Sequence, residues 1–95
     1  MDFEWDEAKR LINLDKHGID FRRAMQIWQR RVIDPYEDSL NDNEIRHIAL
    51  GMIGDDARVI AVVYTLRHGK KRIISARRAR RSERQAYHGQ FGHGV

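Results

Sequence analysis

Two kinds of spacing between apolar residues divide the chain into predicted helices and strands. A helical spacing runs over residues 7–17 and, more regularly, over residues 21–30. Asp6 and Asp20 each precede one of these segments, where a carboxylate can cap a helix, and Gly18 between them suits a helix end. The apolar positions expected to face the core are Ala8, Leu11 and Ile12 in the first helix and Phe21, Ala24, Met25 and Trp28 in the second.

Strands are predicted mainly in the second half of the chain, where apolar residues alternate or run together. The segment 44–52 alternates between two faces, whereas 58–66 is apolar on both faces and therefore suits a central strand. A turn at 68–70 leads into a third strand over 72–76. Residues 1–5 alternate as well, which indicates a short edge strand or an extended lead-in.

The remaining segments have weaker patterns. Val32-Ile33 suits at most a short strand, and Pro35 stops the preceding helical register. The polar residues 36–43 are interpreted as a loop or an irregular edge. A last helix is predicted over about 78–88, with a thin apolar stripe of Ala79 and Ala86.

The order of these elements, β-α-α-β-β-β-α, predicts an α+β fold of one domain. Three consecutive strands joined by short turns would form a small antiparallel meander, with the helices packed on one side of it. We expect the domain to span residues 1–88. Residues 89–95, rich in glycine and histidine, are expected to form a flexible tail.

Composition narrows the class of protein. At 41% apolar and 34% charged residues, the 95-residue chain has enough apolar side chains for one modest core. It has no cysteine, which excludes disulfides and thiolate chemistry. The longest apolar run, Val59 to Tyr64, is far too short to span a membrane, and no signal peptide opens the chain. We therefore expect a cytoplasmic protein.

The positive charge is concentrated in the second half. Residues 1–48 carry eight Lys/Arg and eleven Asp/Glu, whereas residues 49–95 carry ten and three, for a net charge of +4. Most of these cations surround the strand 72–76, between His68 and His88. A surface of this kind suits a polyanion, and RNA or DNA is the commonest one in a cell.

Several segments together resemble the BrnT family of bacterial type II toxins. The resemblance extends over roughly residues 3–87 and depends on the order of the segments more than on any one of them. The segments that carry it are Phe3-Glu4-Trp5-Asp6-Glu7-Ala8-Lys9 with Asn13 and Lys16-His17-Gly18, then Glu44-Ile45-Arg46 and Val62-Val63-Tyr64-Thr65 with Arg67, and finally Arg72-Ile73-Ile74-Ser75-Ala76-Arg77 with Ala79, Glu83-Arg84 and Tyr87.

This resemblance implies a fold similar to that of the RelE toxins and the activity of a metal-independent endoribonuclease that inhibits translation. It also implies a partner, a BrnA-like antitoxin, which neutralises the toxin and through which the complex binds its operator DNA. No cofactor is expected. The small sheet and the helices predicted from periodicity agree with such a fold.

RNA cleavage without a metal needs a base for the 2′-hydroxyl, an acid for the 5′-oxygen, and cations against the charged phosphorane. Guanidinium suits the last task, because its planar fork matches two phosphate oxygens and stays charged. Arg77, just after a strand, is the first candidate; its alternative is a charge that solvates a helix start. Arg46 and Arg67 are expected to lie close together across neighbouring strands, and the sequence leaves open whether Arg77 joins them. Glu44 shares a face with Arg46 and is either a general base or half of a surface ion pair.

Further basic and aromatic residues are candidates for RNA contact, and several have a structural alternative. Lys16 and His17 end the first helix, where cations also stabilise the helix dipole. His68, in a basic turn with Lys70, is either a proton donor or a mobile loop residue. Tyr87 either stacks on a base or packs the last helix onto the sheet. The predicted RNA-binding residues are Lys16, His17, His68, Lys70, Arg80, Arg84 and Tyr87.

Other interpretations of the same residues remain open at this stage. His47 points away from Arg46 and is either a partly buried structural histidine or a catalytic one. The five histidines lack metal-ligand spacing, so no metal site is expected. The chain would be a non-catalytic nucleic-acid-binding or regulatory module if it bound RNA with strong salt dependence and left it uncut. The last helix and its basic surroundings would also suit an acidic or amphipathic antitoxin segment.

Overall fold

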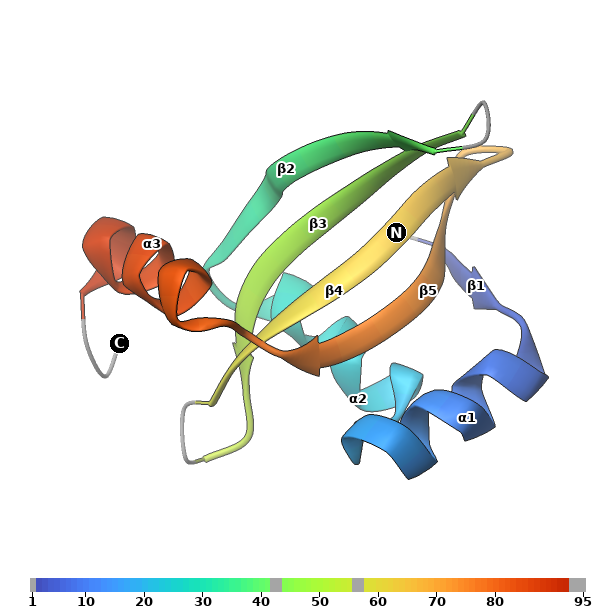
Figure 1. The fold of residues 1–95 in the computed structure, drawn as a ribbon, viewed down its shortest axis with the longest axis horizontal. Helices are drawn as coiled ribbons and strands as arrows, with labels where there is room; N and C mark the ends of the chain where they lie inside the picture. The colour runs from blue at the N-terminus through green and yellow to red at the C-terminus, as the bar shows by residue number, and fades with distance from the viewer. Residues whose placement is uncertain (1, 42–43, 56–57, 93–95) are drawn as a thin grey trace.

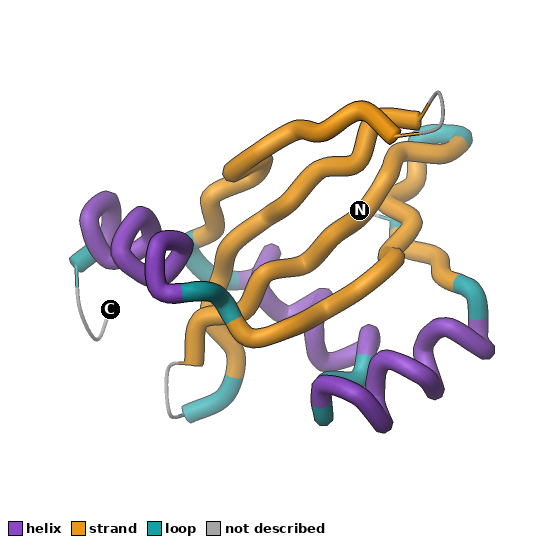
Figure 2. Tube along the Cα trace, in the orientation of Figure 1, coloured by secondary structure: helices purple, strands orange, loops and turns teal. Residues whose placement is uncertain are grey.

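The computed structural model describes residues 2–41, 44–55 and 58–92, which form a five-stranded mixed sheet, three α-helices and a short 3₁₀ helix (Figure 1). The class is α+β, as predicted. Figure 2 shows the strands as one curved layer with the helices outside it. In chain order the elements are β1 (Phe3–Trp5), α1 (Glu7–His17), α2 (Phe21–Ala24), η1 (Met25–Gln29), β2 (Val32–Asn41), β3 (Glu44–Ile53), β4 (Arg58–Arg67), β5 (Lys70–Arg78) and α3 (Arg81–Phe91).

The strands lie in the order β1-β5-β4-β3-β2, and β2 to β5 form an antiparallel meander. β1 joins the far edge and runs parallel to β5, with Trp5 opposite Ile73. The sheet therefore differs from the predicted three-stranded meander by a fourth antiparallel strand and a parallel edge strand. A parallel pair needs no tight turn between its strands, and here the chain from α1 to β4 lies between them.

β2 occupies most of the segment that polarity assigned to a loop or an irregular edge. It forms the outer edge of the sheet, and its register shifts between Ile33 and Glu37, where the Asp34–Pro35 peptide bond is cis. An edge strand exposes one row of backbone groups and many side chains to water, so polar residues and a proline at an irregularity are compatible with it. Residues 42–43 of the predicted loop lie outside the described residues.

The helices agree with the prediction in position more than in detail. α1 spans the predicted residues 7–17 and is capped by Asp6 and Gly18. The second predicted helix divides into α2 and the 3₁₀ helix η1. α3 begins and ends three residues later than the predicted 78–88, so it includes part of the expected tail. Residues 93–95 lie outside the described part of the chain.

Side chains that alternate along β4 reach two different cores. Ile60 and Val62 pack with α2 and η1 on one face of the sheet. Val59 and Ala61 point to the other face, where Tyr87 of α3 closes a second core. Helices therefore cover both faces, and the prediction that they pack on one side is wrong. A central strand that is apolar on both faces needs cover on both, so the pattern of 58–66 already pointed to this arrangement.

α1 attaches to the sheet through a polar residue rather than through its apolar stripe. Asn13 is only 6% exposed, and its side chain bonds to the N–H and C=O groups of Ala76 (3.1 and 2.9 Å) and to the carbonyl of Ile19 (2.9 Å). Leu11 and Ile12, predicted to face the core, are exposed instead. The prediction fails here because one buried amide satisfies three backbone groups, which periodicity of apolar residues does not reveal.

A buried polar cluster connects β2, η1, β4 and β5. Asp34 accepts hydrogen bonds from Trp28 Nε1 (2.7 Å), from Lys71 Nζ (2.9 Å) and from the Tyr64 hydroxyl. The Lys71 side chain is 8% exposed and its Nζ lies 4.1 Å from the centroid of the Tyr64 ring. Burial by itself raises the pKa of Asp34, but the three hydrogen bonds outweigh it and hold that pKa below the ordinary 3.8.

Candidate nucleic-acid interface

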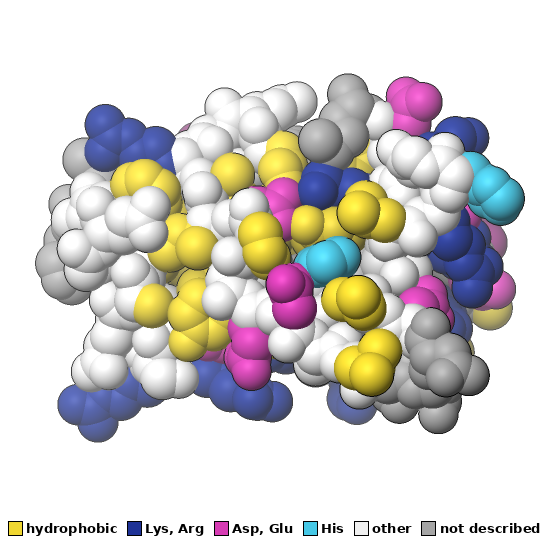
Figure 3. Space-filling model, turned by 90° about the horizontal axis from the view of Figure 1, so that it is seen from above, with side chains coloured by type: hydrophobic (Ala, Val, Ile, Leu, Met, Phe, Trp, Pro, Cys, Tyr) yellow, Lys and Arg dark blue, Asp and Glu magenta, His cyan; other side chains and the backbone are white. Residues whose placement is uncertain are grey.

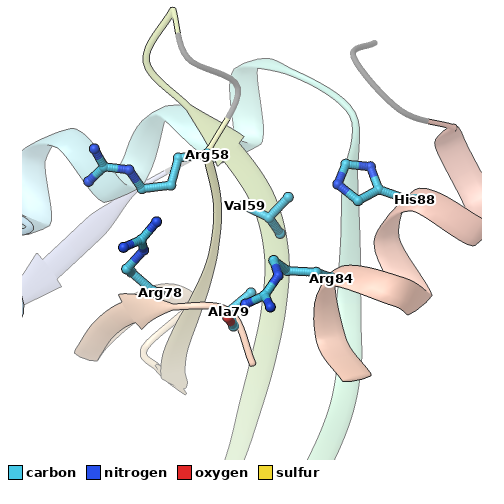
Figure 4. Close-up of a pocket in the computed structure, with 6 residues that line it drawn as sticks. All are labelled: Arg58, Val59, Arg78, Ala79, Arg84 and His88. Atoms are coloured by element: carbon cyan, nitrogen blue, oxygen red, sulfur yellow. Dashed lines mark hydrogen bonds between the residues drawn. The ribbon is translucent and has the colours of Figure 1, made fainter. Parts of the chain in front are cut away.

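A pocket lies where β4 begins, β5 ends and α3 follows. Its volume is about 480 Å³, and it is lined by Arg58, Val59, Arg78, Ala79, Arg84 and His88. In Figure 4, Arg58 and Arg78 lie together on one side of the pocket, and Arg84 and His88 come from α3 on the other. Four of these six described residues can carry positive charge and none is a carboxylate, so the pocket suits an anion.

Backbone contacts hold the two sides of this pocket together. Arg78 pairs with Ile60 across β5 and β4, and the next residue, Ala79, donates its N–H to the carbonyl of Val59 (3.1 Å). Arg84 in turn donates a hydrogen bond to the carbonyl of Ala79 (2.6 Å). The α3 side of the pocket is thus tied to the strands that it faces.

A second cavity continues from this pocket along α3. It measures about 520 Å³ and is lined by Arg81, Arg84, Gln85, His88 and Gly89. Because the two cavities share Arg84 and His88, they form one continuous surface, which we call the α3 groove. Its four arginines, Arg58, Arg78, Arg81 and Arg84, belong to three elements, and this spread suits the successive phosphates of a nucleic-acid chain.

The side of the molecule that carries β2 has a different surface. Figure 3 shows hydrophobic and acidic side chains mixed there, with Lys and Arg mainly at the margins. Glu37 and Asp38 of β2 are both exposed. A polyanion is therefore attracted to the α3 groove rather than to this side.

His88 is the imidazole of the α3 groove. Its Nδ1 lies 2.9 Å from the carbonyl oxygen of Gly92, and its ring meets the Tyr87 ring edge to face at 5.7 Å. A carbonyl oxygen only accepts, so Nδ1 is the donor of this hydrogen bond. An imidazole can act as a general base and, once protonated, as a general acid.

Arg77, the first catalytic candidate, forms a bidentate ion pair with Glu83 (2.8 and 3.0 Å). Their side chains are 17% and 5% exposed, and Glu83 also accepts the N–H of Arg80 (2.7 Å). The hydrogen bonds from Arg77 lower the pKa of Glu83, against burial, which raises it. This pair connects the end of β5 to the first turn of α3, so Arg77 orients the helix that carries Arg84 and His88.

The other three catalytic candidates lie at the opposite end of the sheet. The guanidinium of Arg67, at the end of β4, is 3.9 Å from the carboxylate of Glu44, at the start of β3. Arg46 follows on the same strand, and its Nε is a buried nitrogen for which the described residues provide no hydrogen-bond partner. The length of the β4–β5 ladder separates this group from Arg77. The structure therefore brings Arg46, Arg67 and Glu44 together and leaves Arg77 apart.

Most of the predicted RNA-binding residues lie in three separate places. Lys16 and His17 end α1 and line a small cavity beside it. His68, with φ 50°, stands in the β4–β5 turn, where it and Lys70 are exposed. Arg80 and Arg84 belong to the β5–α3 region, and of the two Arg84 lines the α3 groove.

Two candidates with aromatic rings, Tyr87 and His47, occupy the structural positions that the sequence left open as alternatives to a functional role. Tyr87 is 0% exposed and its hydroxyl donates to the carbonyl of Arg31 (2.7 Å), so its ring packs α3 onto the sheet and offers no face to a base. The side chain of His47 is 18% exposed; Nδ1 pairs with the Asp38 carboxylate and the ring lies 5.1 Å from that of Tyr64. His47 is therefore a partly buried histidine that joins β2 to β3.

Sequence reasoning did not select Arg58, Arg78 or His88, although all three line the α3 groove. The predicted strand 72–76 ended two residues before Arg78, which concealed that this residue lies beside the first residues of β4. Arg81, Arg84 and His88 lie within the predicted helix at spacings of three and four, so their shared face follows from the sequence. That this face meets Arg58 and Arg78 depends on how α3 docks, which the sequence pattern does not indicate.

The family model of the ribonuclease toxin BrnT of type II toxin-antitoxin systems matches residues 5–83. The match covers most of the chain, and the chain therefore belongs to this family of ribonuclease toxins. A type II system pairs its toxin with an antitoxin protein, so such a partner is implied. No curated protein matches the sequence. Arg84 and His88, both on α3, lie beyond the last matched residue.

Two further observations concern membranes and metals. Across residues 2–41, 44–55 and 58–92, no helix is both long and apolar enough to cross a membrane. The same ranges contain no cluster of three or more His, Cys, Asp or Glu side chains arranged to hold a metal ion.

Proposed function

We propose that this toxin cleaves RNA without a metal ion, at the α3 groove. The ribose 2′-oxygen attacks the adjacent phosphorus as it loses its proton, and the 5′-oxygen leaves as it gains one. The products are a 2′,3′-cyclic phosphate, which water can open to a 3′-phosphate, and a 5′-hydroxyl. The observation that carries the proposal is the convergence of four arginines and an imidazole in one groove of a ribonuclease-toxin chain.

The groove contains side chains for each part of this reaction. Arg58 and Arg78 lie together and can contact the non-bridging oxygens, which carry more negative charge in the phosphorane than in the substrate. His88 faces them from α3 and can take the 2′-proton or deliver one to the 5′-oxygen. Arg81 and Arg84 continue along the helix and can hold the neighbouring phosphates.

The catalytic candidates chosen from the sequence have different roles in this proposal. Arg77 acts as a positioning residue through Glu83, and its direct contact with phosphate stays a prediction. Arg46, Arg67 and Glu44 lie at the far end of the sheet, where they would contact RNA away from the scissile phosphate. Lys16, His17, His68 and Lys70 stay predictions as RNA contacts.

In the cell, we expect cleavage of RNA in the cytoplasm to inhibit translation. A BrnA-like antitoxin would neutralise the toxin, and the complex would bind operator DNA through the antitoxin. The arginines that line the α3 groove support a preference for RNA over a membrane surface, because none of the described residues that line it is a large exposed apolar one.

Incubation of the purified, antitoxin-free protein with total RNA in excess EDTA tests the reaction itself. We expect fragments that carry 2′,3′-cyclic phosphate or 3′-phosphate ends, since a 2′-oxygen nucleophile leaves the phosphate on the 3′ side. The ends are identified by whether a ligase or a kinase accepts them before and after phosphatase treatment.

An antitoxin-bound sample prepared in the same way controls for contaminating ribonucleases. Cleavage that stops when EDTA is added would contradict the metal-free mechanism. Intact RNA that is nevertheless shifted on a gel would instead indicate a non-catalytic nucleic-acid-binding module.

A further inference from the structure

The helix α1 presents aliphatic side chains to the solvent. Leu11 is 53% exposed, Ile12 64% and Leu14 38%. They lie within four consecutive positions of a helix that is held to the sheet by the intervening residue Asn13. Exposed aliphatic side chains gathered on one helix commonly mark a surface that another protein covers. On α1 the exposed carboxylates Glu7 and Asp15 lie among them at helical spacings of three and four.

The attachment of α1 makes this exposure a fixed feature of the fold. Asn13 bonds to both backbone groups of Ala76 and to the carbonyl of Ile19, so a rotation that buried Leu11 and Ile12 would break three buried hydrogen bonds. Breaking them would leave the N–H and C=O groups of Ala76 buried without hydrogen-bond partners. Each buried group left in this way lowers the stability of the fold. The aliphatic face therefore stays outside.

A small cavity adjoins this face and adds charge to it. It measures about 170 Å³ and lies between α1 and β5, with Ile12 and Ile74 as its aliphatic lining. Its other lining residues are Lys9, Asn13, Lys16, His17 and Ser75. Three of these can be cationic and none is acidic, so the cavity combines an aliphatic patch with positive charge.

We propose that this surface, which we call the α1 face (Leu11, Ile12, Leu14 and the cavity beside Ile12), is a docking site for the antitoxin. The fitting segment is amphipathic, with an aliphatic or aromatic side chain for the cavity and Asp or Glu residues opposite Lys9 and Lys16. The occupant is a protein rather than RNA, because aliphatic side chains give no contact to phosphate. The inference depends on the family's antitoxin partner and not on where RNA is cut.

The position of the α1 face separates it from the proposed site of cleavage. Asn13 of α1 bonds to Ala76, which belongs to the first core, whereas α3, which lines the α3 groove, packs on the second core through Tyr87. Figure 1 shows α1 beside β5 and α3 apart from it. The sequence had suggested α3 as the antitoxin surface. In the structure, Tyr87 and Phe91 of α3 pack into the second core, so the large apolar residues of this helix face the sheet.

The test uses the toxin with glutamate introduced at both Leu11 and Ile12, and its purified cognate antitoxin. We expect L11E/I12E to weaken the equilibrium binding of purified antitoxin by about a hundredfold or more, because the glutamates lose water in an apolar contact and repel the acidic residues of the antitoxin segment. Wild-type affinity should also fall as salt is raised, since the cavity carries positive charge.

Leu40→Glu is the matched control, because Leu40 is also an exposed leucine (76%) but lies on β2. It should bind antitoxin as wild type does, and circular dichroism should show all variants folded. Equal antitoxin affinity of L11E/I12E and wild type would overturn the proposal. So would a wild-type dimer in sedimentation that L11E/I12E dissociates while antitoxin binding is unchanged, because the occupant would then be a second copy. Binding is measured without RNA. The result therefore tests the docking site even if the proposed cleavage at the α3 groove is wrong.

Discussion

Alanine at both Arg58 and Arg78 is expected to lower kcat/KM for RNA cleavage by about a thousandfold, and either change alone by about a hundredfold. The two side chains lie together in the α3 groove, where attack on phosphorus adds negative charge to oxygens that already carry one. Guanidinium groups fixed beforehand stabilise that added charge without reorganisation. Single-turnover cleavage of a short RNA in EDTA measures the effect.

Arg23→Ala provides a matched control for this loss. Arg23 is an exposed arginine on α2, so its replacement changes the net charge equally without touching the groove. Cleavage should fall less than about threefold in this variant, since only long-range attraction is reduced. If Arg23→Ala and Arg78→Ala lost activity to the same extent, the groove would have no special part in catalysis.

Alanine at Asp34 is expected to lower the free energy of unfolding by about 3–5 kcal/mol. The change leaves the Lys71 ammonium, which is 8% exposed, without its carboxylate, and leaves Trp28 Nε1 and the Tyr64 hydroxyl without their acceptor. Urea unfolding at pH 7 measures the difference. Asp38→Ala, on the same strand but at a half-exposed carboxylate, should cost only about 0–1 kcal/mol.

The pH dependence of the Asp34 contribution has a definite sign. Because the folded-state pKa of Asp34 lies below 3.8, its carboxylate stabilises the fold fully above that pH and loses this effect as the pH falls through the folded value. Asp34→Asn keeps the shape and cannot titrate. The stability gap between wild type and Asp34→Asn should therefore be constant from pH 5 to 7 and shrink in acid below about pH 4. A gap that widened in acid would contradict the assignment.

The sequence predicts those helices and strands whose own spacing of apolar residues is regular. Residues 58–66 are apolar on both faces and form all but the last residue of β4, the middle strand of the sheet, and residues 7–17 match α1. Periodicity did not reveal where an element lies in the fold or which of its sides is buried. Most of β2 was predicted as a loop because an edge strand can be as polar as a loop. The wrong side of α1 was predicted to be buried, because Asn13 is buried through its hydrogen bonds while Leu11 and Ile12 are exposed.

The candidate site was predicted as a charge pattern but not as a geometry. The basic stretch from His68 to His88 does contain most cations of the α3 groove, yet Arg58, from the preceding strand, joins them only through strand pairing. Arg77 looked like the residue most exposed to a phosphate. Its bidentate bond to Glu83, six positions away on α3, depends on how that helix docks, and no spacing rule indicates it.

The central claim, that the α3 groove holds RNA phosphates, is tested most directly by the salt dependence of binding to a 2′-O-methyl RNA, which lacks the nucleophile. Affinity of wild type and of Arg58→Ala/Arg78→Ala is measured over a range of salt concentrations. We expect weaker binding by the double variant and a slope of log K against log salt that is shallower by about 1.4, or about 0.7 for each lost phosphate contact. Identical affinity and slope for the two proteins would contradict it.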